Sequence, residues 1–145
     1  LLNEGQHKLG QRTGTWKSYY NSGKLNVTET YENGLITGRK FNYFENGKLM
    51  SHGIYRNMKK DSVWVSFNED GRITMTETFK NDQLNGVWKT YNLQGTLVGV
   101  QTFENNIQKG LSTTYWIDGK SNPADIVSKH WGYQQVWTLL KPILF

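Results

Sequence analysis

The side chains of this sequence that could do acid–base or metal chemistry are spaced too far apart to act together. His7, His52 and His130 occupy unrelated positions of the chain's repeat, so they predict neither a metal site nor a catalytic relay. Glu29 and Glu77 lie two repeats apart, about 19 Å across four strands, whereas paired catalytic carboxylates of glycosidases lie about 5–9.5 Å apart. The chain has no cysteine, which excludes thiol catalysis and thiolate-bound zinc. We predict no catalytic residue, no metal and no cofactor.

Aromatic and basic side chains are the better candidates for function. Exposed rings beside lysines can hold a peptide, a lipid headgroup or stacked bases. The predicted binding face consists of the residues Trp16, Tyr20, Lys40, Phe44, Trp64, Trp88 and Lys89. Alternatively, a terminal helix or a sister chain covers these rings, and the face would then still be an interaction surface.

These side chains are positioned by a repeat of 24 residues. Glycines recur without insertions at Gly23, Gly47, Gly71, Gly95 and Gly119. Four further columns keep the same period, with an aromatic, an aliphatic or an asparagine at each position. Their first members are Tyr19, Leu25, Tyr31 and Asn33. Self-similarity at a fixed period is the sequence signature of a repeat architecture.

Each repeat contains two short strands, because apolar and β-branched residues alternate between turn signals. Residues 21–24 read Asn-Ser-Gly-Lys and residues 32–34 read Glu-Asn-Gly, which are typical tight turns. Strands joined by such short turns pair antiparallel. We predict an all-β fold, an elongated single-layer antiparallel β-meander of about five 24-residue hairpin repeats. Alternation places Leu25, Val27, Glu29 and Tyr31 on one face.

Composition is compatible with one such domain and indicates little about the partner. The chain has 145 residues, of which 36% are hydrophobic and 14% aromatic, so rings carry much of the apolar surface. The formal net charge is +5, from lysines scattered through the turns rather than clustered in a run. This charge mildly favours anionic partners, but it is also what solubility alone requires. We expect no nucleic-acid partner and no transmembrane segment.

The repeat resembles the bacterial variant of the MORN repeat. Residues 14–25 read Gly-Thr-Trp-Lys-Ser-Tyr-Tyr-Asn-Ser-Gly-Lys-Leu, and related stretches occupy residues 38–49 and 86–97. The resemblance covers roughly residues 8–120 and implies an elongated antiparallel sheet that acts as a scaffold, a dimerisation surface or a binder of proteins or acidic phospholipids. Bacterial members are often labelled antitoxin-like. The sequence departs from the pattern at Ser62, where other repeats have glycine, and at Lys40 and Ser112, which replace tryptophan.

The repeat columns end near residue 120, so we divide the chain into a repeat domain, residues 1–120, and a tail, residues 121–145. Ser121-Asn122-Pro123 is typical of a helix start. The apolar spacing after it predicts a short helix. This tail would cap the last hairpin, or dock on a partner or a membrane surface, through the residues Trp131, Tyr133, Val136, Trp137 and Leu140.

We therefore expect a non-enzymatic protein-interaction scaffold, whose partner is another protein or a sister chain. The alternatives are peripheral binding to anionic phospholipid through the aromatic and basic face, and an accessory repeat domain of a larger protein. The compartment stays open between the bacterial cytoplasm and, if a signal peptide was removed, the periplasm or cell envelope.

Overall fold

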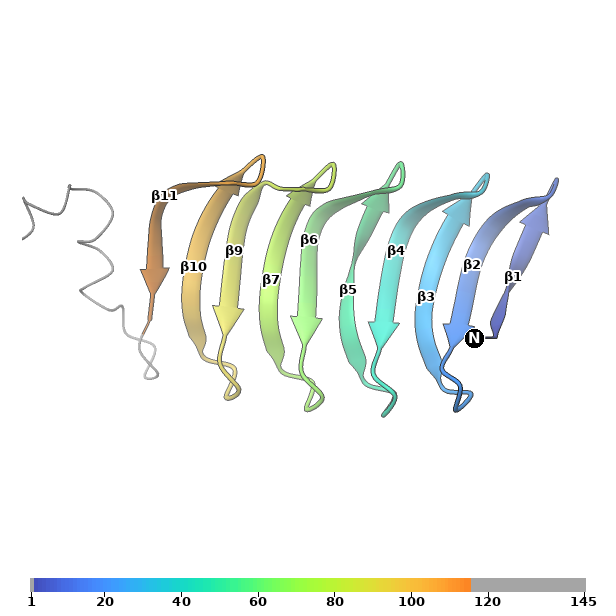
Figure 1. Cartoon of the computed structure of the whole chain (residues 1–145), viewed down its shortest axis with the longest axis horizontal. Helices are drawn as coiled ribbons and strands as arrows, with labels where there is room; N and C mark the ends of the chain where they lie inside the picture. Colours follow the sequence, from blue (N-terminus) through green and yellow to red (C-terminus); the bar gives the residue numbers. More distant parts are fainter. Residues whose placement is uncertain (1, 116–145) are drawn as a thin grey trace, which may run out of the picture.

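The computed structural model describes residues 2–115, which form one antiparallel sheet of eleven strands. The strands lie side by side in chain order and bow in the same direction, so the molecule is a curved ladder (Figure 1). Their bounds are β1 Asn3–Lys8, β2 Gln11–Tyr19, β3 Leu25–Glu32, β4 Leu35–Tyr43, β5 Leu49–Arg56, β6 Lys59–Phe67, β7 Ile73–Lys80, β8 Gln83–Leu84, β9 Gly86–Tyr91, β10 Leu97–Glu104 and β11 Ile107–Thr114.

The predicted antiparallel meander is confirmed. Each of the ten long strands pairs with the next long strand along the chain, and the short β8 pairs with β7 beside the main path. No helix occurs within residues 2–115. The predicted helical cap at 121–145 lies outside the described residues.

The turns along one long edge bond to one another. In the β3–β4 turn, Asn33 and Gly34 both have positive φ, the conformation of a type I′ hairpin turn. The Gly34 amide donates to the Arg12 carbonyl of the preceding hairpin at 2.9 Å, and the three later turns repeat this bond. In two of these later turns, the side chains of Asp82 and Asn106 also accept a backbone amide of the preceding hairpin. The turns therefore tie successive repeats together outside the strand ladder.

A β-bulge in each repeat corrects the predicted assignment of Leu25. The register shifts between Ser18 and Tyr19, so Leu25 pairs with Tyr19 instead of following Val27. The same shift recurs at Tyr43 and Leu49. Because a one-residue slip moves a side chain to the other face of a sheet, Leu25 lies on the Tyr19 face and not beside Glu29.

The two faces of the sheet differ in how well they are packed. The only large hydrophobic residues buried within the described chain are Trp16 and Trp64, which are 9% and 6% exposed. Both lie on one face, here called the tryptophan face, in a row that crosses every long strand near its middle. We call this the central row. From β1 to β11 it consists of Gly5, Trp16, Glu29, Lys40, Gly53, Trp64, Glu77, Trp88, Gln101 and Ser112.

Both buried indoles lie directly on a glycine of the preceding strand. A Cβ added at Gly5 would stand 2.3 Å from the ring of Trp16, and one added at Gly53 would stand 2.1 Å from the ring of Trp64. Neither glycine has a positive φ, so the position requires glycine for space and not for backbone conformation. The indole thus replaces the second layer that usually covers a sheet.

We predict that Gly53→Ala destabilises the protein by about 1–3 kcal/mol, because the methyl group forces the Trp64 ring off the sheet. The measurement is the urea-unfolding midpoint. The same substitution in a Trp64→Ala background removes the clash and is expected to cost much less. An equal cost in both backgrounds would show that the glycine is needed for another reason.

We also predict that Met58→Gly raises the free energy of unfolding by about 0.5–1 kcal/mol. Met58 has a φ of 66° at the second turn position, where the equivalent turn of the first full repeat has Gly34. A left-handed conformation costs less for glycine than for methionine. The reverse change, Gly34→Met, serves as the control and is expected to lower stability by a similar amount. A Met58→Gly variant no more stable than the parent contradicts this account.

Candidate functional site

The tryptophan face holds two similar aromatic clusters, one in β1–β3 and one in β5–β7. Trp16 makes edge-to-face contacts with His7 and Tyr31, and the guanidinium of Arg12 lies 4.4 Å from its ring centroid. In the second cluster, Tyr55, Phe79 and Lys60 surround Trp64 in the same way. The indole nitrogens donate to the backbone carbonyls of Gln6 and Ile54. These two tryptophans are therefore fully engaged by the sheet's own residues.

An ion pair replaces the glycine–tryptophan pair between these clusters. Lys40 Nζ donates to Glu29 Oε1 at 2.6 Å, and the Tyr31 hydroxyl donates to the other carboxylate oxygen at 2.8 Å. Burial alone would raise the pKa of Glu29, but the hydrogen bonds from Lys40 and Tyr31 outweigh it and hold this pKa below its ordinary value. Lys40 takes the repeat position of Trp16 and Trp64, and Glu29 takes that of Gly5 and Gly53. Lysine at the first position is thus matched by glutamate at the second.

The β7–β9 pair breaks this matching rule. Glu77 stands where Gly5 and Gly53 stand in the two clusters, yet the tryptophan column holds Trp88 and not lysine. Trp88 Nε1 is buried and has no hydrogen-bond partner among the described residues. Glu77 forms no ion pair with any residue of 2–115. The β7–β9 pair thus combines the carboxylate of the glutamate–lysine arrangement with the indole of the glycine–tryptophan arrangement.

The structure brings four of the seven predicted face residues together. Trp16, Lys40, Trp64 and Trp88 share the central row, whereas Lys89 follows Trp88 along β9 and therefore lies on the opposite face. Two further residues lie at the ends of strands. Tyr20 and Phe44 begin the turns after β2 and β4, and the Tyr20 hydroxyl donates to the Tyr43 carbonyl. The predicted docking residues Trp131, Tyr133, Val136, Trp137 and Leu140 lie outside the described part of the chain.

The opposite face, here called the valine face, carries exposed apolar side chains that sequence reasoning missed. Val63 is 49% exposed and Val87 is 40% exposed, and Leu111 occupies the same repeat column. The first two members of that column are Thr15 and Arg39. The available signal was this change from polar to apolar along one column, since the sheet does not bury these positions.

Cationic side chains border these valines. Lys17 and Lys109 of the valine face pair with Glu4 and Glu104. Lys89 has no carboxylate within ion-pair distance among residues 2–115, and the same holds for Arg39. The valine face therefore combines exposed apolar groups with uncompensated positive charge.

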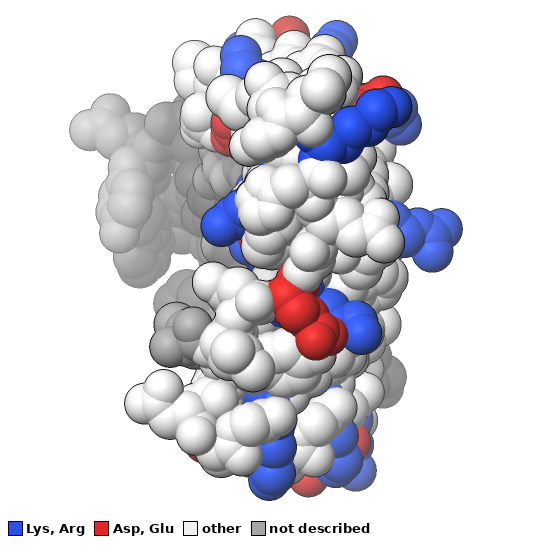
Figure 2. Space-filling view, turned by 90° about the vertical axis from the view of Figure 1, so that its right-hand side faces the viewer, with Lys and Arg blue, Asp and Glu red and all other residues white. Residues whose placement is uncertain are grey.

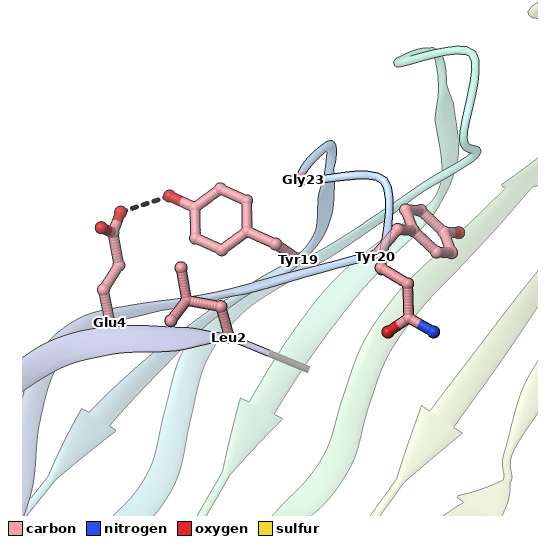
Figure 3. A pocket seen from close by; sticks show the side chains of 6 residues that line it. Leu2, Glu4, Tyr19, Tyr20 and Gly23 are labelled. Atoms are coloured by element: carbon pink, nitrogen blue, oxygen red, sulfur yellow. Dashed lines mark hydrogen bonds between the residues drawn. The ribbon is translucent and has the colours of Figure 1, made fainter.

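An open depression at the β1 end is lined by Leu2, Glu4, Tyr19, Tyr20, Asn21 and Gly23 (Figure 3). The Tyr19 hydroxyl donates to the Glu4 carboxylate, and Lys17 also contacts it. These two hydrogen bonds, chiefly the one from Tyr19, lower the pKa of Glu4, and the same bond raises the pKa of Tyr19. The carboxylate is thus already occupied as an acceptor, and the depression offers no free acid or base.

Residues 2–115 contain no group of three or more histidine, cysteine or acidic side chains that could hold a metal ion. That same stretch also has no helix long and apolar enough to span a membrane.

Comparison with known proteins agrees with this architecture. Residues 12–33 and 36–57 match the family described as the MORN repeat variant. These stretches correspond to β2–β3 and to β4–β5, that is, to two successive hairpins. Repeats of this family are typically non-catalytic. No curated protein matches the chain. Hairpins β2–β3 and β4–β5 of this chain are thus similar to MORN repeats of the variant type.

Proposed function

We propose that the protein is a non-enzymatic binding module, and that its valine face docks a segment of another protein. The observation that carries this proposal is the exposure of Val63, at the centre of β6, and of Val87, the second residue of β9. Single exposed apolar residues are normal on a protein surface, but a row of them on one sheet face is typical of an interaction site.

The spacing of the row fits an extended partner. Val63 and Val87 lie on β6 and β9, with Thr78 of β7 between them. Neighbouring strands lie about 4.8 Å apart, so the valines present methyl groups at intervals of about 10 Å. Ile73 of β7 adds a further exposed aliphatic side chain on this face. A flat strip of this kind suits a peptide or a second sheet better than a compact small molecule.

Charge defines the partner further. Arg39 and Lys89 border the valine row without carboxylate partners in residues 2–115, and the whole chain has a net charge of +5. Figure 2, which views the molecule from the β1 end, shows basic side chains at several separate points with acidic side chains among them. A partner segment that carries both apolar and acidic side chains complements this surface.

The same chemistry supports a second candidate, an anionic phospholipid surface. Exposed aliphatic groups next to lysine and arginine are the features with which peripheral proteins contact such membranes. Acidic protein and acidic lipid are distinguished by testing the same variants with both.

The test is the double variant Val63→Lys, Val87→Lys. Added charge in the docking row is expected to weaken co-purification with a partner from the native cells at least about tenfold, because buried apolar anchors dominate interfaces. Both positions are exposed, so the free energy of unfolding is expected to change by less than about 0.5 kcal/mol. Sedimentation with anionic and neutral vesicles at low salt shows whether lipid is the partner.

Thr15→Lys is the matched control, since Thr15 occupies the same repeat column at the other end of the sheet. It adds a lysine without touching the valines and is expected to leave binding unchanged. Partner recovery that is equal for the parent and the double variant contradicts docking on the valine face. Binding to anionic vesicles alone, with no protein recovered, replaces the first candidate with the second.

A further inference from the structure

In the β7–β9 pair on the tryptophan face, the central row has a carboxylate but no cation of residues 2–115 paired with it. The β3–β4 pair, by contrast, has both. In β3–β4, Glu29 is followed across the row by Lys40, whose ammonium group lies 2.6 Å from the carboxylate. In β7–β9, the equivalent carboxylate is Glu77, and the position of Lys40 is taken by Trp88. The same row position thus holds an alkylammonium group in one repeat and none in the other.

Glu77 is partly buried and has no ion-pair partner within residues 2–115. Register places it directly opposite Trp64 on β6, and the β7–β9 pairing places Trp88 next to it on the other side. Directly paired residues have Cβ atoms about 5 Å apart, which puts the carboxylate between two large apolar side chains. A carboxylate in such surroundings gains from a cationic partner more than one in open water does.

The neighbouring aromatic rings favour the same kind of ligand. Phe79 and Phe103 lie in the adjacent row on this face, and the ring centroids of Trp88 and Phe103 are 5.7 Å apart. The negative faces of aromatic rings attract ammonium groups, and tryptophan does so best. Trp88 is also the tryptophan of the row whose nitrogen has no partner in residues 2–115, so no hydrogen bond fixes its ring in place.

A cation already present nearby does not exclude a second one. Lys60 lies over the rings of Trp64 and Phe79, as Arg12 lies over those of Trp16 and Tyr31. Beside Arg12, the repeat still accommodates Lys40 on the Glu29 carboxylate. A cation over the aromatic rings therefore does not by itself exclude an ammonium group on the neighbouring carboxylate.

We propose that Glu77, flanked by Trp64 and Trp88, binds the alkylammonium group of a lysine side chain supplied by a partner. In β3–β4 the ammonium group of Lys40 makes the equivalent contact with the Glu29 carboxylate. Because the chain has a net charge of +5, a lysine flanked by acidic residues is the favoured form of this ligand. The site lies on the face opposite the valine row, so it is independent of the docking surface proposed above.

The probe is the peptide N-acetyl-Asp-Lys-Asp-amide, titrated into the full chain while the indole N–H signals are followed by NMR. The expected result is a saturable shift of the Trp88 signal. A peptide with norleucine in place of lysine is expected to cause none. Absence of a Trp88 shift with the lysine peptide overturns the proposal.

Matched variants locate the site. Glu77→Gln is expected to weaken peptide binding at least about tenfold, the loss typical of one hydrogen-bonded charge partner. Glu29→Gln makes the same change at the repeat position that Lys40 already fills, and is expected to leave peptide affinity unchanged. Equal affinity of Glu77→Gln and the parent overturns the assignment.

The variant Trp88→Lys tests the same geometry by placing a lysine of the chain itself next to Glu77. It recreates the Glu29–Lys40 arrangement in β7–β9, and is expected to abolish peptide binding while the circular dichroism spectrum stays unchanged. Full peptide binding by a folded Trp88→Lys variant contradicts the proposal. The Val63→Lys, Val87→Lys variant is expected to bind the peptide normally, which separates this site from valine-face docking.

Discussion

The packing of an indole flat against the backbone of a neighbouring strand is the interaction on which this sheet depends. A single layer has no second sheet or helix layer to bury its apolar side chains, so burial has to come from lateral contacts between adjacent strands. Trp16 and Trp64 achieve it by lying on Gly5 and Gly53, and they are the large hydrophobic residues that this packing buries within residues 2–115. Stability in such a ribbon is expected to be nearly additive over repeats.

The central row shows how one backbone geometry accepts different side-chain pairs. Glycine faces tryptophan twice, glutamate faces lysine once, and Gln101 donates to Ser112 in the last pair. Each of these pairs is complementary in volume, in charge or in hydrogen bonding. The pair of Glu77 and Trp88 is complementary in none of these respects, which is why it stands out as a site for an external group and not as part of the scaffold.

Much of the fold follows from the sequence because the repeat is local. The 24-residue period, the turn residues and the alternation along strands predict the meander and place Trp16, Lys40, Trp64 and Trp88 on one face. The position of Leu25 was mispredicted, because a bulge shifts the register and strict alternation does not anticipate it. The sequence correctly separates Glu29 from Glu77, but it does not identify Lys40 as the partner of Glu29, which only cross-strand register reveals.

Candidate binding residues are harder to predict than the fold for a physical reason. Large aromatic rings in a sequence suggest a contact surface, but in a single layer the best-placed rings are used for burial, as Trp16 and Trp64 are. The exposed apolar side chains are then smaller ones, such as Val63 and Val87, at repeat positions that hold no aromatic residue. The face on which a repeat position lies depends on the β-bulges that precede it. Bulges are a property of paired strands and cannot be read from one strand alone.

The complementarity of the central row is tested most directly by converting the ion pair into the glycine–tryptophan type. Unfolding free energies are compared for Glu29→Gly, Lys40→Trp and the double variant. The account predicts a favourable coupling of at least about 1 kcal/mol in the double variant, because the new indole gains the space that the glycine vacates. Single-variant effects that add to within about 0.5 kcal/mol would contradict it.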